Sequence, residues 1–100
     1  MKNVLVLGAG ISGLGAAHVL LRHECNVIVS DLKDNIKDKK EKEILQSFGV
    51  VFEFGMQSVE LLDGIDTVVV SPVISAENIV VMEAFKRRIP VCLLYTSDAA

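Results

Sequence analysis

One stretch of the sequence decides the fold: Gly8-Ala9-Gly10-Ile11-Ser12-Gly13. The residues before it, 4–7, form a short apolar run that is typical of a strand buried on both faces. After it, in residues 12–22, apolar side chains recur at intervals of three and four, which predicts a helix. A Gly-x-Gly-x-x-Gly loop between a strand and a helix indicates a dinucleotide-type α/β domain.

Each glycine of this loop has an expected role. Gly8 allows a tight turn, Gly10 lets the backbone approach an anion, and Gly13 lets the helix pack close to the sheet. The start of the helix directs free N–H groups and a positive dipole end at the ligand, and Ser12 can cap the helix or donate to a phosphate oxygen. The alternative is a tight turn between strand and helix that binds no ligand.

The rest of the chain alternates strand-like and helix-like segments, which predicts a parallel sheet with right-handed crossovers. We expect a doubly wound, Rossmann-like α/β fold of about five strands in the order 3-2-1-4-5, with helices on both faces. The further strands are expected at 27–30, 50–54, 67–70 and 90–94. The lysine-rich stretch that begins at residue 33 is expected to be a solvated loop that runs into a helix ending near 47–49, with Gly49 as the C-cap, because acidic residues lie among the lysines; a basic patch for an anion is the alternative. A short helix or turn is expected at 57–62 and a helix at 76–88. The last helix shows an imperfect apolar stripe of Ile79, Val80, Met82 and Phe85.

Three segments should meet at the carboxyl ends of the strands, beside the point where the strand order reverses. They are the glycine loop, Asp31 after the second strand, and Ser71-Pro72 after the fourth. Asp31 follows Gly13 by 18 residues, where a carboxylate can accept hydrogen bonds from ribose hydroxyls or a base N–H. The alternative for Asp31 is a loop residue that caps the next turn.

Composition excludes several classes of function. A length of 100 residues suits one domain, and a net charge of −3 argues against a nucleic-acid footprint. Glycines interrupt the apolar N-terminal stretch, so it is not read as a membrane span. Cys25 and Cys92 lack metal-ligand spacing and are expected to be buried thiols in a cytoplasmic protein, and His18 is expected on the solvated side of the first helix. No catalytic triad, metal cluster or second phosphate loop for ATP is visible in the sequence.

Three strings resemble the N-terminal domain of the Mur ligases, in the branch that adds D-glutamate. They are KNVLVLGAGISGL at 2–14, VIVSD at 27–31 and DTVVVSP at 66–72. The third is the most discriminating, because many Rossmann-like proteins share the first. The resemblance covers about residues 2–91, so we expect a domain at 1–91.

The resemblance implies that the domain binds the UDP part of UDP-MurNAc-L-alanine and neither NAD nor FAD. It places Ile11 and Ser12 against the diphosphate and uridine. Asp31, Leu32 and Lys33 would hold the uracil and ribose, and the Ser71-Pro72 turn would help to close the pocket. ATP and Mg²⁺ would act in central and C-terminal domains of the parent ligase, so no catalytic residue is expected in residues 1–91.

Two features depart from the family pattern. Val73 stands where the family usually has glycine after Ser-Pro, and a β-branched residue does not easily take a positive φ there. Residues 92–100 do not read like the family's linker to the ATPase domain, and we interpret them as a non-native tail.

Two other functions stay open from the residues. The glycine loop is also common in flavoprotein amine oxidases, so an oxidoreductase fragment that binds FAD or NAD is the alternative to the ligase. Such proteins usually carry a glutamate after the second strand, where this chain has Asp31. A Rossmann-like regulatory module without enzymatic activity is the third interpretation.

Overall fold

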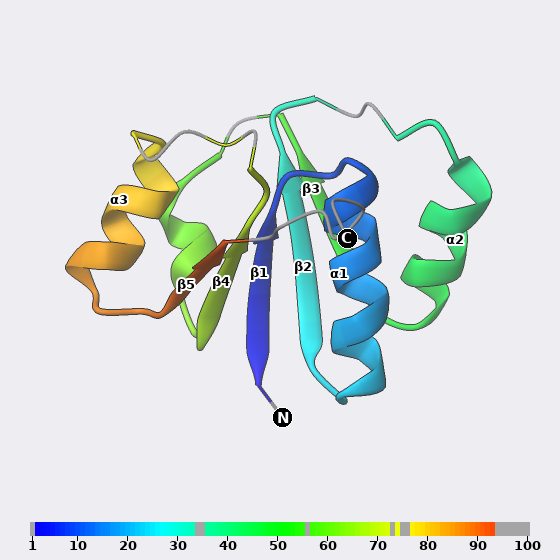
Figure 1. The fold of residues 1–100 in the computed structure, drawn as a ribbon, viewed down its shortest axis with the longest axis horizontal. Helices are drawn as coiled ribbons and strands as arrows, with labels where there is room; N and C mark the ends of the chain where they lie inside the picture. The colour runs from blue at the N-terminus through cyan, green and yellow to red at the C-terminus, as the bar shows by residue number, and fades with distance from the viewer. Residues whose placement is uncertain (1, 34–35, 56, 73, 75–76, 94–100) are drawn as a thin grey trace, which may run out of the picture.

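The strand β1 (Asn3–Leu7) lies at the centre of a five-stranded, all-parallel sheet with the order β3-β2-β1-β4-β5 (Figure 1). The computed structural model describes residues 2–33, 36–55, 57–72, 74 and 77–93. The other strands are β2 (Asn26–Asp31), β3 (Val51–Phe54), β4 (Thr67–Val70) and β5 (Val91–Leu93). The predicted α/β class and strand order are confirmed. The predicted last residue of β5, Leu94, lies outside the described residues.

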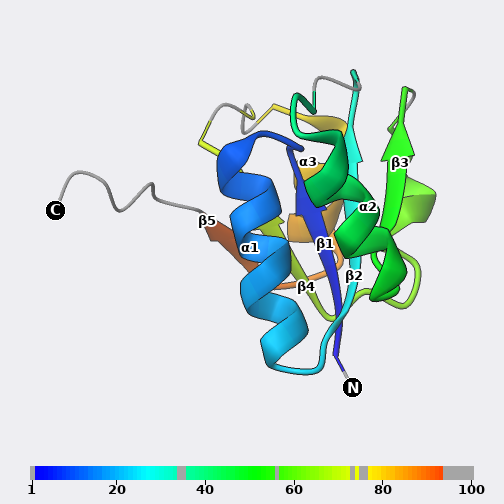
Figure 2. The same cartoon turned by 90° about the vertical axis from the view of Figure 1, so that its right-hand side faces the viewer.

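Helices cover the sheet on both faces (Figures 1 and 2). On one face lie α1 (Ile11–Arg22) and α2 (Lys39–Ser47), and on the other lie the 3₁₀ helix η1 (Val59–Leu62) and α3 (Ile79–Lys86). This division follows from right-handed crossovers, which pass on opposite faces when the chain moves outward from β1 in opposite directions.

The two cores meet at β1, because successive side chains of a strand point to opposite faces. Val4 and Val6 pack with α1 and α2, whereas Leu5 and Leu7 pack with η1 and α3. All four are almost fully buried, and each contributes about 1.5–3 kcal/mol by leaving water. The continuous apolar run at the start of the sequence is therefore explained by a central strand.

Strand register brings the candidate segments to one edge of the sheet. Leu7, the last residue of β1, pairs with Ser30 of β2 on one side and with Val70 of β4 on the other. The glycine loop therefore leaves the sheet between Asp31 and Ser71.

The helix α2 ends close to where the sequence predicts, but Gly49 is not its C-cap. Its last residue is Ser47, Phe48 is the C-cap, and Gly49 follows with φ +99°, a conformation that favours glycine. At its start the Asp38 carboxylate accepts a hydrogen bond from the Glu41 N–H at 3.1 Å, so α2 is capped at both ends.

The predicted inner face of α3 is wrong. Ile79, Met82 and Phe85 are exposed, and the buried residues are Val80, Val81 and Ala84. Nearly every position of this short helix is apolar, so periodicity alone does not select a face. Asn78 sets the helix start, since its side chain accepts from the N–H groups of the second and third helical residues. The predicted first residue, Ala76, lies outside the described residues.

Arg87 connects the end of α3 to the loop before β4 through hydrogen bonds. Its guanidinium donates to Asp63 at 2.9 Å and to Glu83 at 3.0 Å. Hydrogen bonds to Asp63 and then to Glu83 raise the pKa of Arg87 above its ordinary value. This cluster lies on the surface and keeps α3 against η1.

Two expectations about single side chains are corrected. Cys92 is exposed and Cys25 is half-buried, so only Cys25 partly fits a buried thiol. His18 is half-buried, and its Nε2 lies 3.0 Å from the Glu41 carboxylate, where it joins α1 to α2. None of the helices in the described ranges has the length and apolarity needed to cross a bilayer.

Candidate functional site

Two glycines of the loop are required by the fold itself. Gly8 has φ +106°, and a Cβ there would lie 2.7 Å from the Cβ of Ser71. A Cβ on Gly13 would overlap the carbonyl oxygen of Gly8. These contacts support the predicted roles of Gly8 in a tight turn and of Gly13 in close packing of helix on sheet.

Gly10 is different, because nothing in the fold requires a glycine there. Its φ of −75° and ψ of −171° are open to any residue, and a Cβ would meet no atom within 4 Å. Gly10 is also exposed. The missing side chain leaves bare backbone facing open space, which a ligand can approach closely.

The start of α1 lacks the side-chain cap that the other described helices possess. Gly10 is its N-cap, no side chain accepts from its first N–H groups, and its first turn contains no acidic residue. By contrast, Asp38 caps α2, Ser58 caps η1 and Asn78 caps α3. The free N–H groups and the helix dipole at α1 therefore suit an anion. Ile11 and Ser12 form the first residues of α1, and their side chains lie outside what the structure describes.

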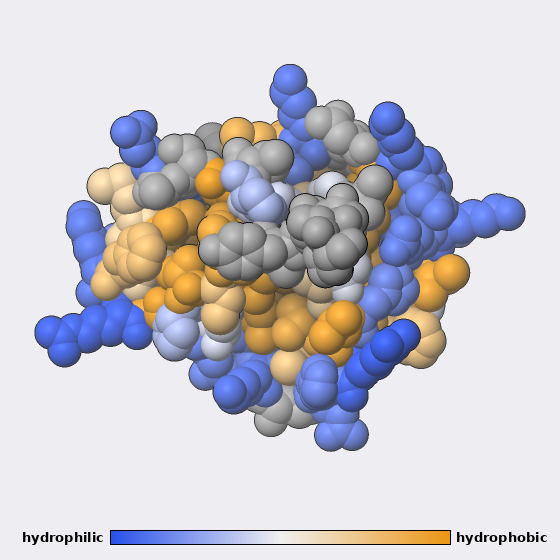
Figure 3. Space-filling view, in the orientation of Figure 1, coloured by the Kyte–Doolittle hydropathy of each residue, from blue (hydrophilic) through white to orange (hydrophobic). Residues whose placement is uncertain are grey.

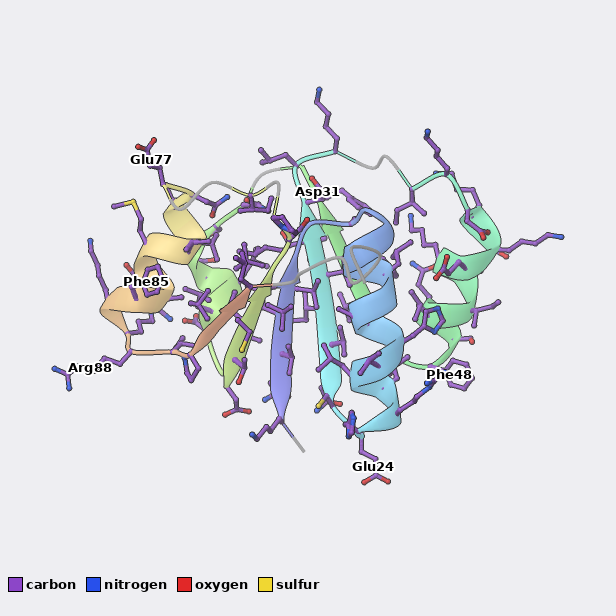
Figure 4. All side chains as sticks on the ribbon, in the orientation of Figure 1. Glu24, Asp31, Phe48, Glu77, Phe85 and Arg88 are labelled. Atoms are coloured by element: carbon purple, nitrogen blue, oxygen red, sulfur yellow. The ribbon has the colours of Figure 1, made fainter. Side chains whose placement is uncertain are left out.

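Asp31 lies directly against the glycine loop (Figure 4). One carboxylate oxygen accepts a hydrogen bond from the Ala9 N–H at 2.8 Å. The other makes a long contact of 3.4 Å with the Lys33 N–H. Asp31 thus holds the loop, and to a lesser degree it also plays the turn-capping role that was its alternative. Leu32 and Lys33 are exposed beside it.

The third segment reaches the loop from the other side. Ser71 is buried, its N–H donates to the Leu7 carbonyl at 3.0 Å, and it packs against Gly8. Pro72 is exposed next to it. The structure therefore brings Ser71, the glycine loop and Asp31 together, as predicted. Val73 lies outside the described residues, so the effect of its departure stays a prediction.

A cleft of about 570 Å³ opens beside the loop on the face of α1 and α2. It has an apolar floor and a charged rim, and its lining residues are Ala9, Gly10, Leu14, Gly15, Ile36, Lys37, Asp38 and Glu41. Sequence reasoning took the lysine-rich stretch after β2 as a solvated surface. Lys37 and Asp38 are indeed exposed, but Ile36 between β2 and α2 is buried and shapes the cleft.

Sequence reasoning also missed a row of polar side chains beneath the loop. Ser30, Gln57 and Asn78 are joined by hydrogen bonds on the α3 side of the sheet. They come from three segments far apart in the chain, and no spacing rule connects them. Only the apolar setting of Ser30 in β2 offered a signal.

A second cleft, also of about 570 Å³, lies at the amino end of the strands between α1 and β4. Apolar surface gathers on this face of the molecule (Figure 3). The lining includes Val4, Leu20, Val69 and both cysteines, and it contains no residue of the glycine loop. Within the described ranges, no three His, Cys, Asp or Glu side chains are grouped to hold a metal ion.

Comparison with protein families decides which class of α/β domain this is. The model of the family described as "Mur ligase MurD-like, N-terminal domain" matches residues 2–93. The chain belongs to this family. The Mur ligase resemblance of the three strings is thereby confirmed, and it favours the ligase over the oxidoreductase interpretation of the same loop.

Several curated relatives of this Mur ligase domain share one name. A UDP-N-acetylmuramoylalanine–D-glutamate ligase from Oceanobacillus iheyensis is 38% identical over 90 residues, which is 90% of this chain and 20% of the relative. The ligase of that name from Caldanaerobacter subterraneus subsp. tengcongensis is 40% identical over 83 residues, 83% of this chain and 18% of the relative. The chain therefore spans about a fifth of the length of the curated relatives it matches.

Among solved structures, the UDP-N-acetylmuramate-alanine ligase MurC from Thermotoga maritima has a similar fold. The superposition has a TM-score of 0.74 at 20% identity, over 94% of this chain and 21% of that one. This likeness supports the fold of the Mur ligase N-terminal domain.

Proposed function

We propose that this domain binds the UDP moiety of UDP-MurNAc-L-alanine, as the substrate-binding domain of a cytoplasmic ligase that adds D-glutamate in peptidoglycan synthesis. The diphosphate lies against the N–H groups at the start of α1, at Ile11, Ser12 and Gly13. Asp31, Leu32 and Lys33 hold the ribose and uracil, and Ser71-Pro72 borders the same site.

The observation that carries the proposal is the hydrogen bond between Asp31 and Ala9. It joins the acidic end of β2 to the glycine loop through protein atoms alone. The site is therefore preorganised, and little ordering has to accompany ligand binding. The Asp31 oxygen that makes only the long contact with Lys33 keeps acceptor capacity for a sugar hydroxyl or a base N–H.

Two further features support a diphosphate at the loop. The first is the uncapped start of α1, which offers N–H donors to an anion. The second is the bare backbone at Gly10, where a side chain would occupy the approach of a phosphate oxygen. Lys33 and Lys37, both exposed, add positive charge around this end of the sheet.

The chemical step is assigned to other parts of the parent ligase. There, ATP with Mg²⁺ would activate the substrate carboxylate as an acyl phosphate, which the D-glutamate amine attacks. The residues of this domain bind and orient the UDP end of the substrate, and the domain alone is not catalytic.

Calorimetry and thermal unfolding with UDP test the proposal. UDP is expected to release or absorb heat on binding and to raise the unfolding temperature, since a ligand at 100 times its Kd stabilises the native state by about 2.7 kcal/mol. No heat and no thermal shift at millimolar UDP would overturn it. Tighter binding of FAD or NAD than of UDP would favour the oxidoreductase alternative.

A glycine variant and its control locate the diphosphate. Gly10→Ala is expected to weaken UDP binding about tenfold or more, because its methyl group enters the ligand's approach. The control is Val19→Ala, an exposed position of α1 that does not line the cleft beside the glycine loop, and its UDP affinity should stay unchanged. UDP affinity equal to that of the unaltered domain in Gly10→Ala would rule out close approach at this position.

A further inference from the structure

A short chain of polar side chains crosses the carboxyl end of the sheet beneath the glycine loop. The Gln57 amide N–H donates to the Ser30 hydroxyl at 3.3 Å, and the Asn78 amide N–H donates to the Gln57 oxygen at 2.9 Å. Ser30 is 1% exposed and Gln57 is 8% exposed. Buried amides of this kind are costly unless both their donors and acceptors are used.

Each end of this chain is attached to a structural element. Asn78 directs its oxygen at the N–H groups of Val80 and Val81, at 2.8 and 3.4 Å, and thereby caps α3. At the other end, the Ser30 carbonyl accepts from the Gly8 N–H at 2.8 Å. The connection therefore runs from the start of α3 to the glycine loop.

The orientation of the Gln57 amide follows from that attachment. Because the Asn78 oxygen is engaged by helix N–H groups, only its NH₂ group can face Gln57. Gln57 must then present its oxygen to Asn78 and its NH₂ group to Ser30. The position therefore requires a polar side chain of this length that accepts from Asn78 and can bond to the Ser30 hydroxyl, which an aliphatic residue cannot supply.

The same connection holds the segment that follows β4. At one end of that segment, Ser71 donates to the Leu7 carbonyl and packs on Gly8. At its other end, Asn78 is held by Gln57. Ile74, which lies between them in the sequence, packs against the core on the α3 side. Gln57 therefore fixes the far end of a segment whose near end touches the glycine loop.

We propose that Gln57 is a positioning residue of the nucleotide site, which sets the placement of the glycine loop and of the Ser71-Pro72 segment through Ser30 and Asn78. The inference rests on the proposed function, because it concerns the site assigned to UDP. Gln57 itself touches no ligand in this scheme.

The test uses Gln57→Met, which keeps the length of the side chain and removes both hydrogen bonds. UDP affinity is expected to fall about 3- to 30-fold, the range typical of residues that act on a site through others. The matched control is Leu62→Val, a core change in η1 on the same face of the sheet. This substitution lowers stability but does not alter Ser30, Gln57 or Asn78. The UDP affinity of the variant should stay within about twofold of that of the unaltered domain.

Amide hydrogen exchange in the ligand-free protein gives a second readout. In Gln57→Met the Gly8 and Val80 N–H groups are expected to exchange faster, relative to the global unfolding rate, than in Leu62→Val. Gln57→Glu retains an acceptor for Asn78 and can accept from the Ser30 hydroxyl, so it should restore protection at Val80. If Gln57→Glu restores protection, the hydrogen bonds of residue 57 hold the site, and the volume of its side chain does not.

The outcomes separate the two proposals. Unchanged UDP affinity and unchanged protection in Gln57→Met would overturn the role of Gln57. If the unaltered domain bound no UDP, the proposed function would fail. Hydrogen exchange alone would then decide the connection: faster exchange at Gly8 would support it, and unchanged exchange would overturn it.

Discussion

Gly13 and Gly15 lie two residues apart in α1, yet they carry different constraints. Gly13 faces the sheet, where a Cβ would overlap the carbonyl oxygen of Gly8, whereas a Cβ on Gly15 would meet no atom within 4 Å. The same substitution at the two positions should therefore have effects of opposite sign on stability.

Gly13→Ala is expected to lower the free energy of unfolding by about 1–3 kcal/mol, since α1 must move away from the glycine loop to admit the methyl group. Gly15→Ala is expected to raise it by about 0.5–1 kcal/mol, because alanine replaces glycine in a helix interior without strain. Urea denaturation followed by circular dichroism measures both. A stable Gly13→Ala would mean that helix and loop are less tightly packed than described.

Asp31 holds the glycine loop and is proposed to bind UDP, and two substitutions can separate these roles. Asp31→Asn keeps an oxygen for the Ala9 N–H, whereas Asp31→Ala leaves that N–H without its acceptor. The binding free energy of UDP should become less favourable by about 1–3 kcal/mol in Asp31→Ala. Of the two variants, only Asp31→Ala should also lose stability. Calorimetry and thermal unfolding on the same samples separate the two effects. Equal stability of both variants would contradict the loop-holding role.

At the scale of single residues, the sequence predicted contacts that follow from backbone rules. The roles of Gly8 and Gly13, and the meeting of Asp31 with the loop, come from the geometry of a strand, a turn and a helix. Gln57 was not predicted as a site residue, because its two partners are 27 and 21 residues away and depend on how separate segments pack.

Among the elements, α2 depends most on its own termini. It is mostly polar, and of its residues only Leu45 is buried. Packing therefore stabilises α2 less than it stabilises α1. The hydrogen bond from the Glu41 N–H to Asp38 contributes a larger share of the stability of α2.

Asp38→Ala is expected to cost about 1 kcal/mol in the stability of α2, because the Glu41 N–H loses its acceptor. The loss should appear as faster hydrogen exchange of the Glu41 amide, with the strands unaffected. The control is Lys40→Ala in the first turn, where the change should stay within about 0.5 kcal/mol. Identical exchange in the two variants would show that the cap is unimportant.

The helices also show where periodicity stops being informative. Apolar residues of α1 recur at intervals of three and four, and the structure buries Ala17 and packs Leu20 and Leu21 against the core as that spacing requires. In α3 apolar residues surround the axis, so the wrong face was selected, and Phe85 is 60% exposed. The buried face is set by how α3 packs against η1 and β5, which the sequence pattern does not show.

For the whole molecule, strand order was predictable because right-handed crossovers leave few arrangements for alternating strands and helices. The two clefts could not be predicted from the sequence, because each lies between elements that are far apart in the chain. One opens at the carboxyl end of the strands beside the glycine loop, and the other at the amino end beside the cysteines.

This separation predicts how the thiols respond to ligand. Cys92 is exposed and Cys25 half-buried, so a thiol reagent should modify Cys92 first. UDP should leave the labelling rate of Cys92 unchanged, because the cysteine cleft is at the opposite end of the sheet from the proposed site. Mass spectrometry of timed samples measures both rates. Strong protection of Cys92 by UDP would place the ligand in the cysteine cleft instead.

The central position of β1 has a consequence for how the protein is made. Its loop is supported by Ser30 and Asp31 on one side and by Ser71 on the other, so its two supports are synthesised some forty residues apart. A nascent chain that has been synthesised only as far as β3 possesses the glycine loop but lacks Ser71, which packs against Gly8. Any binding of the proposed UDP ligand during translation must therefore wait until β4 has left the ribosome and paired with β1.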